Sequence, residues 1–187
     1  MISVVIPCRA GDVAGITITT LDRQTHPPDL VVVVFDQGRG AAWARNRGFD
    51  ATDSEFVLFA DADIAFEPDA IENLLRCLEA HPDAAYSFGA YHMAGRDYCT
   101  RPYDAELLKR LNIASTMSLF RRDGFPGFDE NLVRFQDWDL NLTLMEQGKY
   151  GVNCGRRIFT TEKRNGITFG GITVAEAEAV IRKKHGI

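Results

Sequence analysis

Residues 55–63 of the chain read EFVLFADAD, and this stretch decides the fold class. The unbroken apolar run Phe56–Ala60 is typical of a short strand buried on both faces of a parallel sheet. Asp61 and Asp63 follow directly, where the strand leaves the sheet. Ligands of open α/β sheets bind at the carboxyl ends of the strands, so the stretch predicts an α/β protein with a carboxylate pair at its binding edge.

Two further apolar runs precede this strand, Ser3–Ile6 and Leu30–Phe35, and both are rich in β-branched residues. They predict two more strands that are buried on both faces of a parallel sheet. A helix fits between them, and residues 40–50 place Ala, Trp and Arg at helical spacing. The resulting order of strand, helix, strand, helix and strand predicts a doubly wound α/β sheet.

The second half of the chain is less regular and predicts an α+β arrangement. Its expected elements are a helix over 68–81, a strand over 84–91, a short helix over 104–111, an extended stretch over 113–120, a helix over 137–147, a strand over 151–159 and a final helix from the Thr173/Glu176 capping box to about His185. No repeat or linker divides the chain, so residues 1–187 predict a single domain.

Composition and charge exclude several classes of protein. The 187 residues are 45% hydrophobic and 25% charged, with a formal net charge of -5, which is typical of a globular domain and argues against a general nucleic-acid grip. No apolar stretch approaches the roughly 20 residues of a spanning helix, and no basic leader precedes the first apolar run. Four scattered cysteines without a CxxC pair predict free thiols and a cytoplasmic protein.

Asp61-Ala62-Asp63 is the strongest candidate site in the sequence. On an extended backbone, side chains at i and i+2 point the same way, with Cα atoms about 6.6 Å apart, so both carboxylates can address one hard cation such as Mg²⁺ or Mn²⁺. A solvated turn is the alternative. Apolar Ile64 and Phe66 follow at once, however, and grouped carboxylates near a core need a cation or hydrogen bonds, which favours a metal site.

Three weaker features accompany this pair, and each has two interpretations. Asp36, at the end of the second strand, can accept a hydrogen bond from a nucleoside or simply mark a turn before Gly38. Arg45 and Arg47 can pair with phosphate or lie on a solvated helix face. Asp137, at the start of a helix, can act as a general base or as the helix N-cap.

Six short motifs in one order resemble the family 2 glycosyltransferases. They are SVVIP (3–7), FDQG (35–38), ARNRG (44–48), FADAD (59–63), GFDE (127–130) and QDWD (136–139). The resemblance implies the GT-A fold, with a Rossmann-like nucleotide-binding half over about residues 1–95, an acceptor and catalytic half over about 96–187, and a mixed, mostly parallel sheet flanked by helices. It further implies a minimal catalytic domain that transfers a hexose, with inversion, from a nucleotide-diphosphate sugar to an acceptor hydroxyl, using Mn²⁺ or Mg²⁺.

The resemblance also implies a role for each matched residue. The metal would be bound by Asp63, with Asp61 on ribose or metal, and Asp137 would be the catalytic base. Trp138 and Asp139 are candidates for the acceptor site, although a Trp on an apolar helix stripe more often packs in a core. The residues implied for the nucleotide sugar are Pro7, Cys8, Arg9, Asp36, Arg45, Asp61 and Ala62.

Several positions depart from the family pattern. Cys8 and Arg9 stand where a Thr-Tyr-Asn type sequence is usual, the connection after Asp36 is short, and Gln136 stands where Glu is common. No histidine follows the strand over 151–159 near the metal, and we expect His185 to be exposed rather than a ligand.

Two other function classes stay open. A DxD after a buried strand also resembles the nucleophile motif of haloacid-dehalogenase-like phosphatases, and the departures suggest a nucleotide-sugar binding module without catalysis. The acceptor is open as well. A saccharide, a lipid-linked glycan, a protein and a modified nucleic-acid base are all compatible with the sequence, because acceptor recognition falls in the variable second half.

Overall fold

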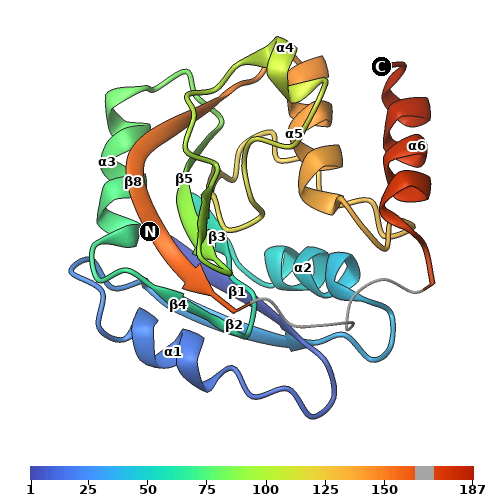
Figure 1. The fold of residues 1–187 in the computed structure, drawn as a ribbon. Coiled ribbons are helices and arrows are strands. Elements are labelled where there is room, and N and C mark those ends of the chain that lie inside the picture. The colour runs from blue at the N-terminus through green and yellow to red at the C-terminus, as the bar shows by residue number, and fades with distance from the viewer. Residues whose placement is uncertain (163–170) are drawn as a thin grey trace.

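The computed structural model describes residues 1–162 and 171–187. At its centre is a curled, mixed sheet with the strand order β2-β1-β3-β7-β5-β8-β4, and β6 pairs with β5 (Figure 1). The elements, in chain order, are β1 (Ile2–Cys8), α1 (Gly15–Leu21), β2 (Leu30–Phe35), α2 (Ala41–Asp50), β3 (Phe56–Phe59), β4 (Ile64–Phe66), α3 (Ala70–Ala80), β5 (Tyr86–Met93), β6 (Arg96–Tyr98), α4 (Ala105–Leu108), β7 (Leu119–Arg121), α5 (Gln136–Glu146), β8 (Gly151–Thr161) and α6 (Val174–His185).

Helices cover both faces of this sheet. On one face, side chains of α1 and α3 such as Leu21 and Leu74 share a core with Val4 of β1. On the other face, α2 and α5 pack against the sheet, and Val5 belongs to this second core. Helices α4 and α6 pack on α5, on the far side from the sheet (Figure 1). This two-faced burial confirms the α/β fold class.

Strands β1, β2 and β3 are parallel, as predicted for the first half. In the second half, β5 and β8 are parallel, whereas β7, β4 and β6 run antiparallel to their neighbours. The sheet is therefore mixed, and its uniformly parallel part is limited to the first three strands.

Strand β2 differs from its prediction. Every residue of β1 and of β3 is buried, as expected, but none of the six residues of β2 is. The prediction that Leu30–Phe35 is buried on both faces is wrong because β2 is the last strand of the sheet. Its connection to α2, residues 36–40, is too short to carry a further strand beside it.

Two elements of the second half are shorter than predicted. The extended stretch expected over 113–120 contributes only the three residues of β7, and the helix expected over 104–111 is the single turn of α4, capped by Asp104. The Thr173/Glu176 capping box is present at the start of α6, as predicted. All four cysteines are free thiols. Within the described residues, no helix is both long and apolar enough to cross a membrane.

Candidate active site

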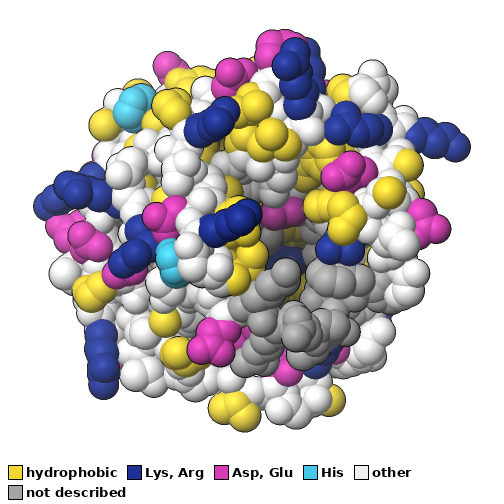
Figure 2. Space-filling view, in the orientation of Figure 1, with side chains coloured by type: hydrophobic (Ala, Val, Ile, Leu, Met, Phe, Trp, Pro, Cys, Tyr) yellow, Lys and Arg dark blue, Asp and Glu magenta, His cyan; other side chains and the backbone are white. Residues whose placement is uncertain are grey.

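A cleft of about 380 Å³ opens at the carboxyl ends of β1, β2 and β3. Every residue that the sequence implied for the nucleotide sugar or the metal lines it. The lining residues are Pro7, Cys8, Arg9, Gly11, Asp12, Val13, Asp36, Ala41, Arg45, Asp61, Ala62 and Asp63. Figure 2 shows that one face of the molecule is hollowed near its centre, with an acidic side chain visible inside the hollow. The chain thus brings four separate motifs of its first half to one concave site.

Asp36 holds the turn that leads out of β2. Its backbone N–H donates to the Cys8 carbonyl (2.8 Å), and its Oδ1 accepts from the N–H of Gly38 (3.0 Å). Gln37 and Gly38 both adopt positive φ in this turn, at 52° and 78°. The turn interpretation is therefore correct, and it is compatible with ligand binding because the same residue also lines the cleft.

Arg45 joins the DxD motif to the start of α5. The side chain is 5% exposed, its Nη2 lies 2.7 Å from Asp61 Oδ1, and its Nη1 donates to Gln136 Oε1 at 2.7 Å. The guanidinium also lies over the Phe128 ring, 5.4 Å from its centroid. A solvated helix face is thus excluded for Arg45. For Arg47 the interpretation as a residue on a solvated helix face is correct, because Arg47 is exposed and pairs with Asp50.

Thr17 holds the backbone of the DxD segment through hydrogen bonds, and the sequence did not predict this role. The Thr17 hydroxyl lies 2.9 Å from the backbone carbonyl of Asp61 and 3.0 Å from that of Ile64. The residue is completely buried in α1. A threonine in a short helix carries no local signal for this contact, because the partners are 44 and 47 residues away.

Asp61 and Asp63 are the residues of the cleft that could hold a divalent cation. Across residues 1–162 and 171–187, no group of three or more His, Cys, Asp or Glu side chains is arranged around one metal position. Mg²⁺ sites commonly use one or two protein carboxylates, and substrate phosphates and water complete the shell. Two carboxylates in a cleft are therefore a fitting donor set. Of the stretch after β8 that lacks a histidine, residues 163–166 lie outside the described residues.

Asp137 lies in the first turn of α5 and does not cap it. The N-cap position is Phe135, in a left-handed conformation (φ 59°) without a side-chain cap, so the N-cap interpretation of Asp137 is wrong. The Asp137 Oδ1 instead accepts from the N–H of Trp138 (2.9 Å). Burial raises the pKa of Asp137, and the Trp138 N–H and the positive charge of Arg45 oppose the rise.

Trp138 and Asp139, the candidates for the acceptor site, are both buried, and the core interpretation fits Trp138. Trp138 is 2% exposed, and its Nε1 donates to the Leu108 carbonyl at 2.7 Å. Asp139 is 3% exposed, and its Oδ1 lies 2.7 Å from Lys184 Nζ and 2.8 Å from His185 Nε2. Neither residue lines the cleft, because both side chains face the layer of α4 and α6 that covers α5.

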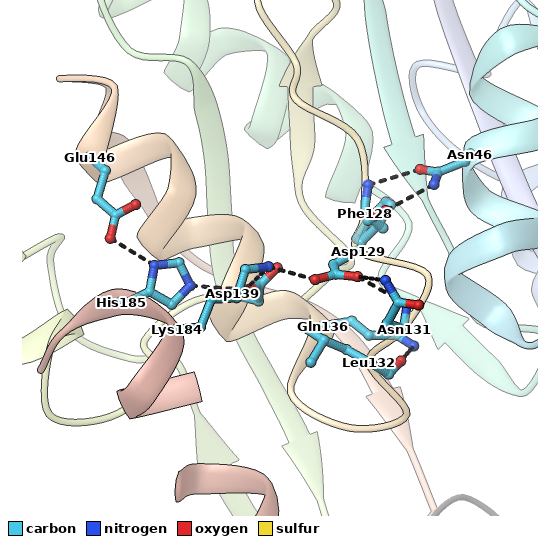
Figure 3. A network of polar contacts seen from close by, with 10 residues as sticks. All are labelled: Asn46, Phe128, Asp129, Asn131, Leu132, Gln136, Asp139, Glu146, Lys184 and His185. Carbon is cyan, nitrogen blue, oxygen red and sulfur yellow. Dashed lines mark hydrogen bonds and ion pairs between the residues drawn. The ribbon is translucent and has the colours of Figure 1, made fainter. Parts of the chain in front are cut away.

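His185 is also placed differently from its expectation. Its side chain is 2% exposed and lies between two carboxylates of α5, Asp139 and Glu146, the latter 2.7 Å from Nδ1 (Figure 3). The expectation of an exposed histidine is wrong, because α6 folds back onto α5. Both ring nitrogens of His185 have carboxylate partners on α5.

A chain of polar contacts connects four parts of the molecule around the start of α5 (Figure 3). Asn46 of α2 bonds both the carbonyl (2.9 Å) and the N–H (2.8 Å) of Phe128. The next residue, Asp129, lies 2.7 Å from the same Lys184 that binds Asp139. The hydrogen bond from Lys184 is the main cause that lowers the pKa of Asp129. For Lys184, burial lowers the pKa, but the hydrogen bonds to Asp129 and Asp139 outweigh it and the net pKa is raised. The basic last turn of α6 was the available sequence signal for this contact.

The sequence matches the profile of "Glycosyl transferase family 2" over residues 17–137, which is more than half of the chain. The chain therefore belongs to this family. A curated relative, described as an uncharacterized glycosyltransferase of Haemophilus influenzae, is 24% identical over 144 residues, which cover 68% of this chain and 48% of the relative. The chain thus spans about half the length of that relative.

Solved structures show the same fold. S. aureus TarS 1–349 in complex with UDP-GlcNAc superposes with a TM-score of 0.77 at 16% identity, covering 98% of this chain and 66% of TarS 1–349. Glucosyl-3-phosphoglycerate synthase of Mycobacterium tuberculosis, in complex with Mn²⁺, UDP-glucose and phosphoglyceric acid, gives a TM-score of 0.59 at 16% identity, covering 97% and 76% of the two chains. The chain has the GT-A fold, as the resemblance implied.

Proposed function

We propose that the protein transfers a hexose from a nucleotide-diphosphate sugar to an acceptor hydroxyl, with inversion at the anomeric carbon. The observation that carries the proposal is the cleft in which Asp36, Arg45 and the DxD pair meet. Through Gln136, Arg45 connects this cleft to the helix that carries Asp137. One buried side chain thereby bonds both to the proposed donor site and to the residue that precedes the candidate base.

A uridine-diphosphate sugar is the donor that we propose. TarS has been crystallised with UDP-GlcNAc, and the mycobacterial synthase with UDP-glucose and Mn²⁺. In this chain, Asp36 follows β2 directly and lines the cleft, and this position supports a role in accepting hydrogen bonds from the nucleoside. Arg45 and the backbone around Cys8 border the space for the diphosphate.

Asp61 and Asp63 would hold Mn²⁺ or Mg²⁺ together with the donor's diphosphate. When bound, the cation offsets the charge that develops on the departing nucleoside diphosphate. The buried guanidinium of Arg45 supplies a fixed positive charge on the same side of the cleft, and its ion pair orients the Asp61 carboxylate.

Asp137 is the general base of the proposed reaction. It takes the proton of the acceptor hydroxyl as the oxygen forms its bond to the anomeric carbon, while the bond from that carbon to the diphosphate oxygen breaks and the electron pair leaves with the nucleoside diphosphate. The raised pKa of Asp137 strengthens it as a proton acceptor. One base and one displacement give inversion.

The same residues support a division of the chain into a donor half and an acceptor half. The cleft residues lie within 7–63, and Asp137 lies in the second half, so we propose that the acceptor approaches from the side of α5. The phosphatase alternative is not proposed, because the chain belongs to family 2.

Thermal stability in the presence of nucleotides tests the donor site. We expect UDP with Mn²⁺ at about 100 times its dissociation constant to raise the melting temperature by about 5–10 °C, and GDP, CDP or dTDP to raise it less. Asp63→Ala should lose the shift. Asp53→Ala, which removes an exposed carboxylate outside the cleft, should keep it. Absence of a shift with every nucleotide would contradict the proposal. A shift without any transfer or donor hydrolysis would favour a binding module instead.

A further inference from the structure

Strand β2 has the composition of a buried strand in an exposed position. Its six residues, LVVVVF, contain no polar or charged side chain, yet Leu30, Val33 and Phe35 are 42%, 37% and 54% exposed. Fully apolar strands of this kind normally lie inside a sheet that is covered on both faces. Exposed apolar surface of this kind is typical of an interaction site.

The outer side of β2 is also an open hydrogen-bonding edge. β2 pairs with β1 on one side, and within residues 1–162 and 171–187 no strand pairs with its other side (Figure 1). The N–H of Asp36 bonds to Cys8 of β1, so the alternating pattern of a ladder turns the backbone groups of Val31, Val33 and Phe35 outward.

β2 lacks the features that normally block edge pairing. Natural edges carry lysines, prolines, bulges or inward-pointing charges, and the register of β2 against β1 is uninterrupted over all six residues. The connection over 36–40 leads directly into α2 and leaves this edge open.

We propose that β2 pairs with β2 of a second copy of this chain, antiparallel and about a two-fold axis, so that one continuous sheet runs through a homodimer. An edge strand is self-complementary in this orientation, and the contact closes at two copies. The outward-facing backbone groups pair with each other when Val33 lies on the axis, which places Val31 opposite Phe35 of the partner, on the same face of the sheet.

The charges at the two ends of β2 favour the antiparallel orientation. Exposed Asp29 precedes the strand and exposed Arg39 follows it. Antiparallel pairing brings Asp29 of one copy toward the end of the other copy that carries Arg39, beyond the buried Asp36, whereas parallel pairing about a two-fold axis would bring Asp29 to Asp29 and Arg39 to Arg39.

The test is the mass of the full-length chain in solution, measured by light scattering after gel filtration and by sedimentation. At about 100 µM, which populates a complex with a dissociation constant of about 10 µM, we expect twice the monomer mass of 20.8 kDa. Val33→Lys should give the monomer mass, because it places two lysines face to face on the axis. Val180→Lys, at a residue of α6 that is 44% exposed, is the matched control and should remain a dimer.

Three results would overturn the proposal. They are a monomeric wild-type chain at that concentration, a Val33→Lys variant that is folded by circular dichroism and still dimeric, and assemblies larger than two. Phe35→Lys, at the most exposed position of the strand, replaces Val33→Lys if that variant does not fold. The outcome does not depend on the proposed enzymatic activity, since no substrate enters the measurement.

Discussion

Arg45 and Asp137 are the two residues on which the proposed chemistry depends most. Arg45 is buried, and its charge is shared between an aspartate 16 residues away and a glutamine 91 residues away in the sequence. Because residue 136 is a neutral glutamine, the positive charge of Arg45 also acts on the neighbouring Asp137 and lowers its pKa, against the effect of burial. A glutamate at this position would offset part of that charge.

Asp137→Asn should separate activity from stability. Loss of the base should lower the rate of transfer by about 10²–10⁴-fold. The raised pKa means that the folded state disfavours the charged form of Asp137, so at pH 7 the neutral Asn variant should be at least as stable as the wild type. Steady-state kinetics and urea unfolding measure the two quantities. Normal transfer by the variant would remove the base assignment.

Arg45→Met should lower the stability of the protein and shift the pH dependence of its activity. It removes two hydrogen bonds of a buried cation, so we expect the free energy of unfolding to fall by about 1–3 kcal/mol. Because a nearby positive charge lowers a carboxyl pKa, its loss should raise the pKa of Asp137. The acidic limb of kcat/KM should then move to higher pH.

Arg47→Met is the matched control for this variant, since Arg47 lies two residues further along α2 and forms an exposed ion pair. We expect it to change the free energy of unfolding by no more than about 0.5 kcal/mol and to leave the pH profile in place. A pH profile of Arg45→Met that coincides with that of the wild type would show that Arg45 does not act on the base.

At the scale of elements, α6 holds α5 and the loop before it in place. Its last turn carries Lys184 and His185 onto carboxylates of α5 (Figure 3), and Ile181 packs in the same core as Trp138. The start of α5 is thus bonded on two sides. Arg45 of α2 bonds Gln136, and Lys184 and His185 of α6 bond Asp139. The candidate base lies between these two contacts.

Lys184→Met should loosen this arrangement. It leaves the buried carboxylate of Asp139 with one partner fewer and removes the hydrogen bond to Asp129, so we expect a loss of about 1–3 kcal/mol in the free energy of unfolding at pH 7. Lys183→Met, at an exposed neighbour on the same helix, should change it by no more than about 0.5 kcal/mol.

The effect of Lys184→Met should also depend on pH. The folded state lowers the pKa of Asp129, so its contribution is fully present above the ordinary carboxyl pKa and is lost as the pH falls through the lowered value. The difference between wild type and variant should therefore shrink in acid. Urea unfolding at a series of pH values measures it, and a difference that stays constant into acid would contradict a charge-based contact.

At the scale of the whole molecule, the sheet and α2 join the two halves into one body. Strand β3 of the first half pairs with β7 of the second, and Asn46 of α2 bonds the loop at Phe128. Unfolding one half would expose the sheet edge and the core of the other. The chain should accordingly unfold as a single cooperative unit.

The two tryptophans, Trp43 and Trp138, allow this to be measured. Trp43→Phe leaves Trp138, beneath α4 and α6, as the fluorescent reporter of the second half. We expect its urea transition to have the same midpoint as the far-UV circular dichroism of the whole chain. Separate midpoints would show that the halves unfold independently.

Local sequence determined much of the frame of this protein. The runs Ile2–Cys8 and Phe56–Phe59 form buried strands, the Thr173/Glu176 box starts α6, and the DxD pair lies at the carboxyl edge of the sheet. These features follow from hydrophobic period, capping and chain direction, which act over a few residues and are therefore readable in a single segment.

The tertiary structure decided which side chains meet and which surfaces stay open. Strand β2 has the composition of a buried strand, yet it is exposed because it is the last strand of the sheet. His185 is buried, and Trp138 lies in a core away from the cleft, because α6 and α4 pack over α5. Such outcomes depend on which elements become neighbours across many residues of chain, and hydrophobic pattern within a segment does not specify its neighbour.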